Sequence, residues 1–162
     1  MFILGLIITV LLIAVFAVVY LDTSATLHSG LARSLETFQL YSVSIANETV
    51  VPPSIDLNVS FFMRSLADFT ITVDSTSILM YINNKAIGTV APIGKGLTFV
   101  VRPKENVTLY SIPHIINSEI IDDIRKPPYI FSANGTISAY AQYLFVTESD
   151  TRVISISQIV QS

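Results

Sequence analysis

The sequence predicts a mostly β protein, an antiparallel β-sandwich with one short amphipathic helix, preceded by a long N-terminal transmembrane helix. Three observations predict it: residues 2–21 carry no charge, most later segments alternate apolar with polar residues, and one segment near residue 120 has helical spacing. The chain has 162 residues, 51% hydrophobic and 13% charged, with a mean hydropathy of +0.63. This composition excludes a disordered, collagen-like or coiled-coil chain.

The uncharged segment, residues 2–21, is long enough to cross a lipid bilayer. Twenty helical residues extend about 30 Å, the thickness of the hydrocarbon core. A cleavable signal peptide is the alternative, but it needs a basic start, a shorter apolar stretch and a small-residue cleavage site. No Lys or Arg precedes this segment, and Thr23-Ser24-Ala25 is a poor cleavage site. We therefore expect an uncleaved anchor in the bilayer, with Tyr20 in the interfacial layer.

The orientation of this anchor has two weak indications. Asp22 follows the segment and no basic residue occurs before Arg33, so the distribution of positive charge slightly favours an extracellular C-terminal domain in a single-pass protein of the cell membrane. Four of the seven asparagines also lie in N-x-[ST] sequons, which are candidate N-glycosylation sites. These are Asn47, Asn58, Asn106 and Asn134. Strands rich in Ser and Thr also produce such sequons by chance.

Residues 22–36 are expected to form a helical stalk between the anchor, residues 2–21, and a β-sandwich domain, residues 37–162. Leu27, Leu31, Leu35 and Phe38 repeat at intervals of four, four and three, as on one face of a helix. A separate helix capped by a residue near Asp22 is the alternative. His28, in the stalk, has no second His, Cys or paired carboxylate near it in the sequence, so we interpret it as solvated rather than as a metal ligand.

Alternation with a period of two predicts the strands of the domain. The clearest case is residues 54–63, where apolar and polar side chains alternate with one exception. Turns are expected at Asn83-Asn84-Lys85, Gly94-Lys95-Gly96, residues 103–106 and Asn134-Gly135. The expected strands cover residues 38–45, 54–63, 69–81, 86–90, 97–102, 107–112, 129–131, 137–146 and 151–160.

One amphipathic helix is expected between these strands. It would start at Pro113, place Ile116, Ile120 and Ile124 on one face, and end at the basic pair Arg125-Lys126 before two prolines. The basic end complements the helix dipole. Asp122 and Asp123 point about 100° apart on such a helix, so we interpret them as a soluble face rather than as a catalytic pair.

The segment IDLNVSFFMRSLADFTITVDSTSILMYINNKAIGTV, the turn in VVRPKENVTL and the strands in NGTISAYAQYLFV resemble a late-embryogenesis-abundant (LEA) type 2 domain, also called the water-stress and hypersensitive-response domain. The resemblance covers residues 37–161. It differs at residues 64–68, where the family often has an Asn-Pro pair. The resemblance implies a small sandwich similar in shape to fibronectin type III, without catalytic activity, of the kind found in desiccation-related proteins and in membrane-anchored proteins of archaea and plants.

The sequence contains no nucleotide-binding, metalloprotease or serine-hydrolase motif, so we expect no catalytic, cofactor-binding or metal-binding residues. His114 is interpreted as structural or solvated, because no orienting partner is identifiable for a catalytic base. The absence of cysteine excludes thiolate zinc sites and disulfides, and the net charge of −3 argues against nucleic-acid binding.

Three functions are consistent with these features. The first is a membrane-anchored, outward-facing, non-catalytic sandwich that acts in binding or in protection of the cell envelope. The second is a structural subunit of an assembly, either a pilin-like filament or an accessory subunit of a membrane complex, with self-association or protein partners. The third, an envelope hydrolase, has no nucleophile, base and orienting residue that the sequence identifies.

Overall fold

The computed structural model describes residues 2–90 and 98–161. The expected Gly94-Lys95-Gly96 turn lies outside these residues. The described elements, in chain order, are α1 (Phe2–Glu36), β1 (Gln39–Thr49), β2 (Ser54–Arg64), β3 (Ile71–Ile82), β4 (Lys85–Thr89), β5 (Phe99–Val101), β6 (Asn106–Ser111), β7 (His114–Ile115), α2 (Ser118–Arg125), β8 (Tyr129–Tyr143) and β9 (Val146–Val160).

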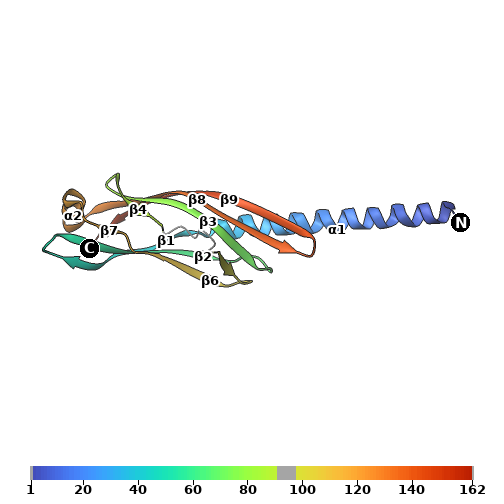
Figure 1. Ribbon diagram of the computed structural model, residues 1–162, viewed down its shortest axis with the longest axis horizontal. Helices are drawn as coiled ribbons and strands as arrows, with labels where there is room; N and C mark the ends of the chain where they lie inside the picture. Colours follow the sequence, from blue (N-terminus) through green and yellow to red (C-terminus); the bar gives the residue numbers. More distant parts are fainter. Residues whose placement is uncertain (1, 91–97, 162) are drawn as a thin grey trace.

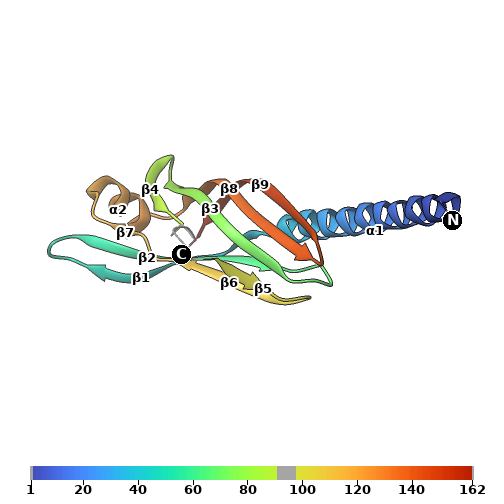
Figure 2. The same ribbon diagram turned by 45° about the vertical axis from the view of Figure 1, so that its right-hand side comes forward.

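The strands form two antiparallel sheets. One has the order β1-β2-β6, with β7 also paired to β2, and the other has the order β4-β3-β8-β9, with β5 also paired to β3. Figure 1 shows the two sheets as layers, with α1 leaving one end of the sandwich and α2 at the other end. In Figure 2 the β1–β2 hairpin extends beyond the rest of the domain at the end opposite α1. The predicted fold class, an antiparallel sandwich after a long apolar helix, is confirmed.

The core between the sheets comes from alternate residues of the strands. In β2 every second side chain points inward, and Ile55, Leu57, Val59, Phe61 and Met63 are all fully buried. This pattern confirms the alternation seen in residues 54–63, which buries one face of a strand and leaves the other partly solvated. The pairing of β1 with β2 shifts between Leu40 and Ser42, so the alternation of β1 is interrupted there.

The expected turn at Asn134-Gly135 is wrong, because both residues lie within the continuous strand β8. Asn134 pairs with Leu79 and Gly135 with Ile78 of β3. A Cβ at Gly135 would lie 1.9 Å from the backbone oxygen of Ser77, so the glycine lets two backbones approach closely. Alternate side chains of β8 point inward both before and after this position, so the segment stays a strand rather than forming a turn.

The turn that separates β8 from β9 lies elsewhere. Tyr143 pairs with Val146, so Leu144 and Phe145 form a two-residue hairpin turn. Leu144 has φ of 53°, in the left-handed region that Gly and Asn usually occupy. Because Leu144 and Phe145 are apolar and aromatic, like strand residues, the sequence predicts a strand here, and this prediction is wrong.

The amphipathic helix is shorter than expected. It begins at Ser118, after Asn117, whose side chain accepts hydrogen bonds from the backbone N–H groups of Glu119 and Ile120. Residues His114 and Ile115 instead form β7, which pairs with β2. Ile120, Ile121 and Ile124 are buried, but Ile116 precedes the helix and is exposed.

Candidate functional site

The N-terminal half of α1 presents an uncovered apolar surface. Large apolar side chains between Leu6 and Leu21 are exposed, with Leu12 at 65% and Leu21 at 66%. Among the described residues, one helix, Gly5–Glu36, is long and apolar enough to cross a membrane. Exposure of this much contiguous apolar surface is unusual for a protein surrounded by water.

The C-terminal half of α1 is packed into the sandwich. Leu27, Leu31 and Leu35 are at most 2% exposed and belong to the hydrophobic core, confirming that these leucines share one helix face. This part of α1 contacts β8 and β9 of one sheet and β2 of the other. The helix continues without a break through Asp22, so the segment expected to be a stalk is helical and also contributes to the core.

Polar and close-packed contacts hold this half of the helix in place. The hydroxyl of Ser34, fully buried, donates to the carbonyl of Gly30 at 2.7 Å and accepts from the backbone N–H of Leu66 at 2.9 Å. Gly30 itself faces the ring of Phe69, and no side-chain atom fits between them without displacement. These contacts fix the direction in which the apolar half leaves the domain.

The β8–β9 hairpin also contacts α1, nearer to its N-terminus than the buried leucines. Its turn residue Phe145 stacks on Phe16, with ring centroids 4.7 Å apart and planes inclined by 17°, and its centroid lies 6.4 Å from that of Tyr20. Nearer the domain, the hydroxyl of Ser24 donates to Glu148 at 2.5 Å. Figure 1 shows this hairpin extending along α1 in the direction of the N-terminus.

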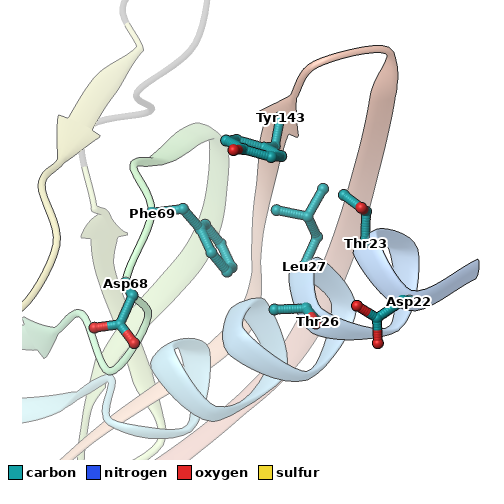
Figure 3. A pocket seen from close by; sticks show the side chains of 7 residues that line it. All are labelled: Asp22, Thr23, Thr26, Leu27, Asp68, Phe69 and Tyr143. Carbon is teal, nitrogen blue, oxygen red and sulfur yellow. The ribbon is translucent and has the colours of Figure 1, made fainter. Parts of the chain in front are cut away.

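A pocket of about 360 Å³ lies where α1, the β2–β3 connection and β8 meet. Figure 3 shows its lining, with Phe69, Leu27 and Tyr143 forming an apolar wall and Asp22 and Asp68 at its edges. Asp68 forms an exposed ion pair with Lys104 at 3.0 Å. Thr23 and Thr26 complete the lining. The pocket therefore combines aromatic faces with carboxylate groups at the end of the domain where α1 emerges.

Charged side chains gather at the opposite end, around α2. Lys85 contacts Asp123 at 3.1 Å and Glu119 at 3.3 Å, and Arg125 contacts Glu48 at 2.6 Å. The hydrogen bond to Asp123 is the main cause that raises the pKa of Lys85 above its usual 10.5; desolvation opposes it, and Glu119 adds to it. Asp123 thus links α2 to β4, and Arg125 links α2 to β1. These contacts are in addition to the expected positions of Asp123 on the solvent-facing side of the helix and of Arg125 at its C-terminal end.

His114 has the orienting partner that sequence analysis did not identify. Its Nδ1 lies 2.6 Å from Oδ1 of Asp56, its neighbour in the β2–β7 pairing, although 61% of the His114 side chain is exposed. It borders a shallow pocket of about 180 Å³ whose other lining residues are Ala86, Ile87, Ile115, Ile116, Asn117 and Ile120. These side chains offer no hydroxyl or thiol nucleophile beside the imidazole.

The remaining candidate residues are dispersed over the domain. Asn47, Asn106 and Asn134 are exposed on β1, β6 and β8, and Asn58 is half-buried on β2. His28 is exposed on α1. Within the described part of the chain, no three His, Cys, Asp or Glu residues are grouped as a metal site would require. The structure therefore does not bring these residues together into one centre.

The contact between the hairpin and α1 does not follow from the sequence. Phe16 and Phe145 are far apart in the chain, and no local pattern indicates that they meet. The one available signal was the absence of Gly, Asn, Asp and Pro from residues 143–146, which makes the turn itself unusual.

No protein-family model matches the chain, and no curated protein matches its sequence. An X-ray structure of a Northeast Structural Genomics Consortium target is similar in fold, with a TM-score of 0.50, 10% identity, and coverage of 77% of this chain and 88% of that one. A structure assigned to the ApaA protein of Bordetella pertussis has a TM-score of 0.45 and 11% identity, over 75% of this chain and 94% of that one. A solution structure described as an LEA protein has a TM-score of 0.38 and 9% identity, over 87% and 88%.

Proposed function

We propose that this chain is a single-pass membrane protein whose β-sandwich faces outward and acts, without catalysis, in binding or in protection of the cell envelope. The proposal includes the relationship to LEA type 2 domains that the sequence resemblance implies. One observation carries it: the exposed apolar half of α1 continues without a break into a half that the domain core encloses. Lipid around residues 2–21 would cover the apolar surface and hold the sandwich at the membrane.

Extraction and labelling of the full-length chain test this function. The chain has no cysteine, so Ser157→Cys, at an exposed position of β9, gives a unique site for a membrane-impermeant maleimide. We expect the protein to stay in the membrane pellet at alkaline pH and Ser157→Cys to be labelled on intact cells. Leu12→Cys, inside the apolar segment, is the control that should stay unlabelled. Release from the pellet would contradict anchoring, and labelling only after lysis would contradict the outward orientation.

Glycosylation would accompany an outward orientation in a host that modifies sequons. The exposed Asn47, Asn106 and Asn134 are the better acceptors, because Asn58 is half-buried. Mass spectrometry of the intact chain should show added hexose mass. Variants with Gln at each asparagine would assign that mass, and an unmodified chain from such a host would contradict this part of the proposal.

The alternative function is a structural subunit of an assembly. It is favoured by β9, which ends the strand order of its sheet and exposes Val153 at 75% and Ile159 at 61%. A strand at the end of a sheet's strand order, with exposed apolar side chains, is a surface to which a strand of another chain can add. Gentle solubilisation followed by light scattering separates the two functions. A monodisperse monomer supports the first, whereas filaments or stoichiometric partners support the second.

A further inference from the structure

The end of the β8–β9 hairpin is apolar where a turn is ordinarily polar. We call Tyr143, Leu144 and Phe145 the hairpin tip, and their exposed fractions are 57%, 65% and 51%. Leu144 occupies the left-handed region at φ of 53°, where Gly or Asn would be the usual residues. Turn chemistry therefore does not account for these side chains. Three large side chains at the end of a hairpin form an apolar surface that projects from the domain.

Within the hairpin tip, Phe145 lies beside the apolar segment of α1, while Tyr143 borders the pocket that also includes Asp22 and Thr23. Phe145 stacks on Phe16 at 4.7 Å. Phe16 precedes the last apolar residue, Leu21, by five positions, which corresponds to about 8 Å along the helix. Phe145 is therefore level with the interior of the segment, while the nearby Tyr20 is suited to the interfacial layer.

The two elements also change from apolar to polar at the same level. In α1 the change comes at Asp22, after Leu21, and in β9 it comes at Thr147, after the buried Val146. Ser24 and Glu148, the polar residues just beyond each change, are joined by a 2.5 Å hydrogen bond. This bond places the two changes side by side, so the apolar parts of α1 and of the hairpin lie on the same side of it, as they would at the surface of a bilayer.

We propose that the hairpin tip is a second membrane-inserted element, embedded among the acyl chains and headgroups of the leaflet nearest the domain. The inference rests on the proposed anchoring of residues 2–21. The docked half of α1 holds the anchor in a fixed position relative to the hairpin tip, because Leu27, Leu31 and Leu35 are enclosed in the core. When the lipid covers Phe16, it covers Phe145 as well. Insertion of a few apolar side chains to a depth of 5–10 Å is typical of elements at the headgroup boundary, about the level of Phe145.

Tryptophan fluorescence tests this directly, because the chain contains no tryptophan. Phe145→Trp in the full-length chain, reconstituted in phosphatidylcholine vesicles, gives a single reporter at the tip. Tyr110→Trp, at a 65% exposed position of β6, is the control for an exposed aromatic residue of the domain. Phe16→Trp is the control for the anchor itself. Each variant is measured in plain lipid and in lipid with brominated acyl chains, which quench only fluorophores in the membrane.

We expect brominated lipid to quench Phe145→Trp and Phe16→Trp by about twofold or more, with blue-shifted emission, and to leave Tyr110→Trp unchanged. Quenching of Phe16→Trp without quenching of Phe145→Trp would overturn the inference, whether water or a protein covers the tip, and would leave the anchor intact. Absence of quenching at both positions would overturn the anchor and the inference together. A nitroxide label on Leu144→Cys, in this cysteine-free chain, provides an independent depth from its accessibility to oxygen.

Discussion

Gly30 of α1 lies against the ring of Phe69, so closely that a Cβ at position 30 would be 2.5 Å from Cζ of Phe69 and 3.2 Å from Cβ of Ala67. This contact sets the distance between the docked half of α1 and the β2–β3 connection. Glycine is costly inside a helix, by up to about 1 kcal/mol relative to alanine, so its presence here is explained by the space rather than by helix formation.

Gly30→Leu is therefore expected to destabilise the domain by about 1–3 kcal/mol, because the larger side chain must displace Phe69 or the helix. Thermal unfolding of the reconstituted chain measures this. Gly5→Leu is the matched control, since a Cβ at Gly5 has nothing within 4 Å. Equal stability of Gly30→Leu and the unmodified chain would show that α1 does not pack as described.

Removal of the Ser34 hydroxyl should weaken the same junction. Ser34→Ala leaves the backbone N–H of Leu66 without its 2.9 Å acceptor, and a loss of about 1–3 kcal/mol in the free energy of unfolding is expected. Ser29→Ala is the control, because the exposed Ser29 hydroxyl donates only to the nearby carbonyl of Thr26. Denaturant unfolding of both variants distinguishes the buried bond from the exposed one. Similar losses for the two would contradict the prediction.

Gly135→Ala should be among the most damaging single substitutions in the chain. The new Cβ would lie 1.9 Å from the backbone oxygen of Ser77 and 2.6 Å from Cα of Ile78, and backbone atoms cannot move aside as a side-chain end can. A loss of more than about 3 kcal/mol, or failure to fold, is expected. Thr136→Ala, at the adjacent half-buried position, should fold normally. Expression and circular dichroism measure both, and a stable Gly135→Ala chain would be the contrary result.

Stability is expected to fall at strongly alkaline pH, for two reasons that act in the same direction. Burial raises the pKa of Tyr129 above its usual 10.0, so above that pH the unfolded chain loses the phenol proton first and unfolding becomes easier. The ion pair with Asp123 raises the pKa of Lys85, so its contribution is complete below pH 10.5 and is lost as the pH rises through the raised value.

Melting temperatures between pH 8 and pH 12 should therefore be level at first and then decline. Tyr129→Phe should reduce the steepness of the decline, because it removes the buried group that must ionise. Lys85→Gln should have a smaller effect, since that ion pair is only partly buried. An unchanged decline in Tyr129→Phe would exclude the tyrosine as its cause.

Local patterns in the sequence predicted most of the fold. The alternation from Ile55 to Met63 requires a half-buried strand, and the uncharged run before Asp22 requires a long apolar helix, so both follow from single segments. The Asn134-Gly135 pair failed as a signal because the apolar alternation of β8 continues on both sides of it. Tertiary packing against Ser77 explains that glycine, and no local pattern contains this information.

The candidate site was predicted only in part, because it consists of contacts between distant segments. The apolar residues of α1 were visible as such, but the contact of Phe16 with Phe145 depends on how β9 returns along the helix. His114 and Asp56 likewise meet only through the pairing of β7 with β2, after the expected helix begins five residues later than Pro113. A signal of period two or 3.6 reports which face of an element is buried and not which element covers it.

The continuous course of α1 has a consequence for how this domain meets other molecules. On the anchoring proposed above, the unbroken helix joins the apolar segment rigidly to the sandwich, so the far end, where α2 and the β1–β2 hairpin lie, is directed away from the bilayer (Figure 1). A ligand that approaches that end meets a domain whose position relative to its own anchor is already fixed by folding, so less entropy is lost there on association. Neighbouring copies would present their far ends in parallel, so the lateral density of the protein would set how many of them a multivalent ligand engages.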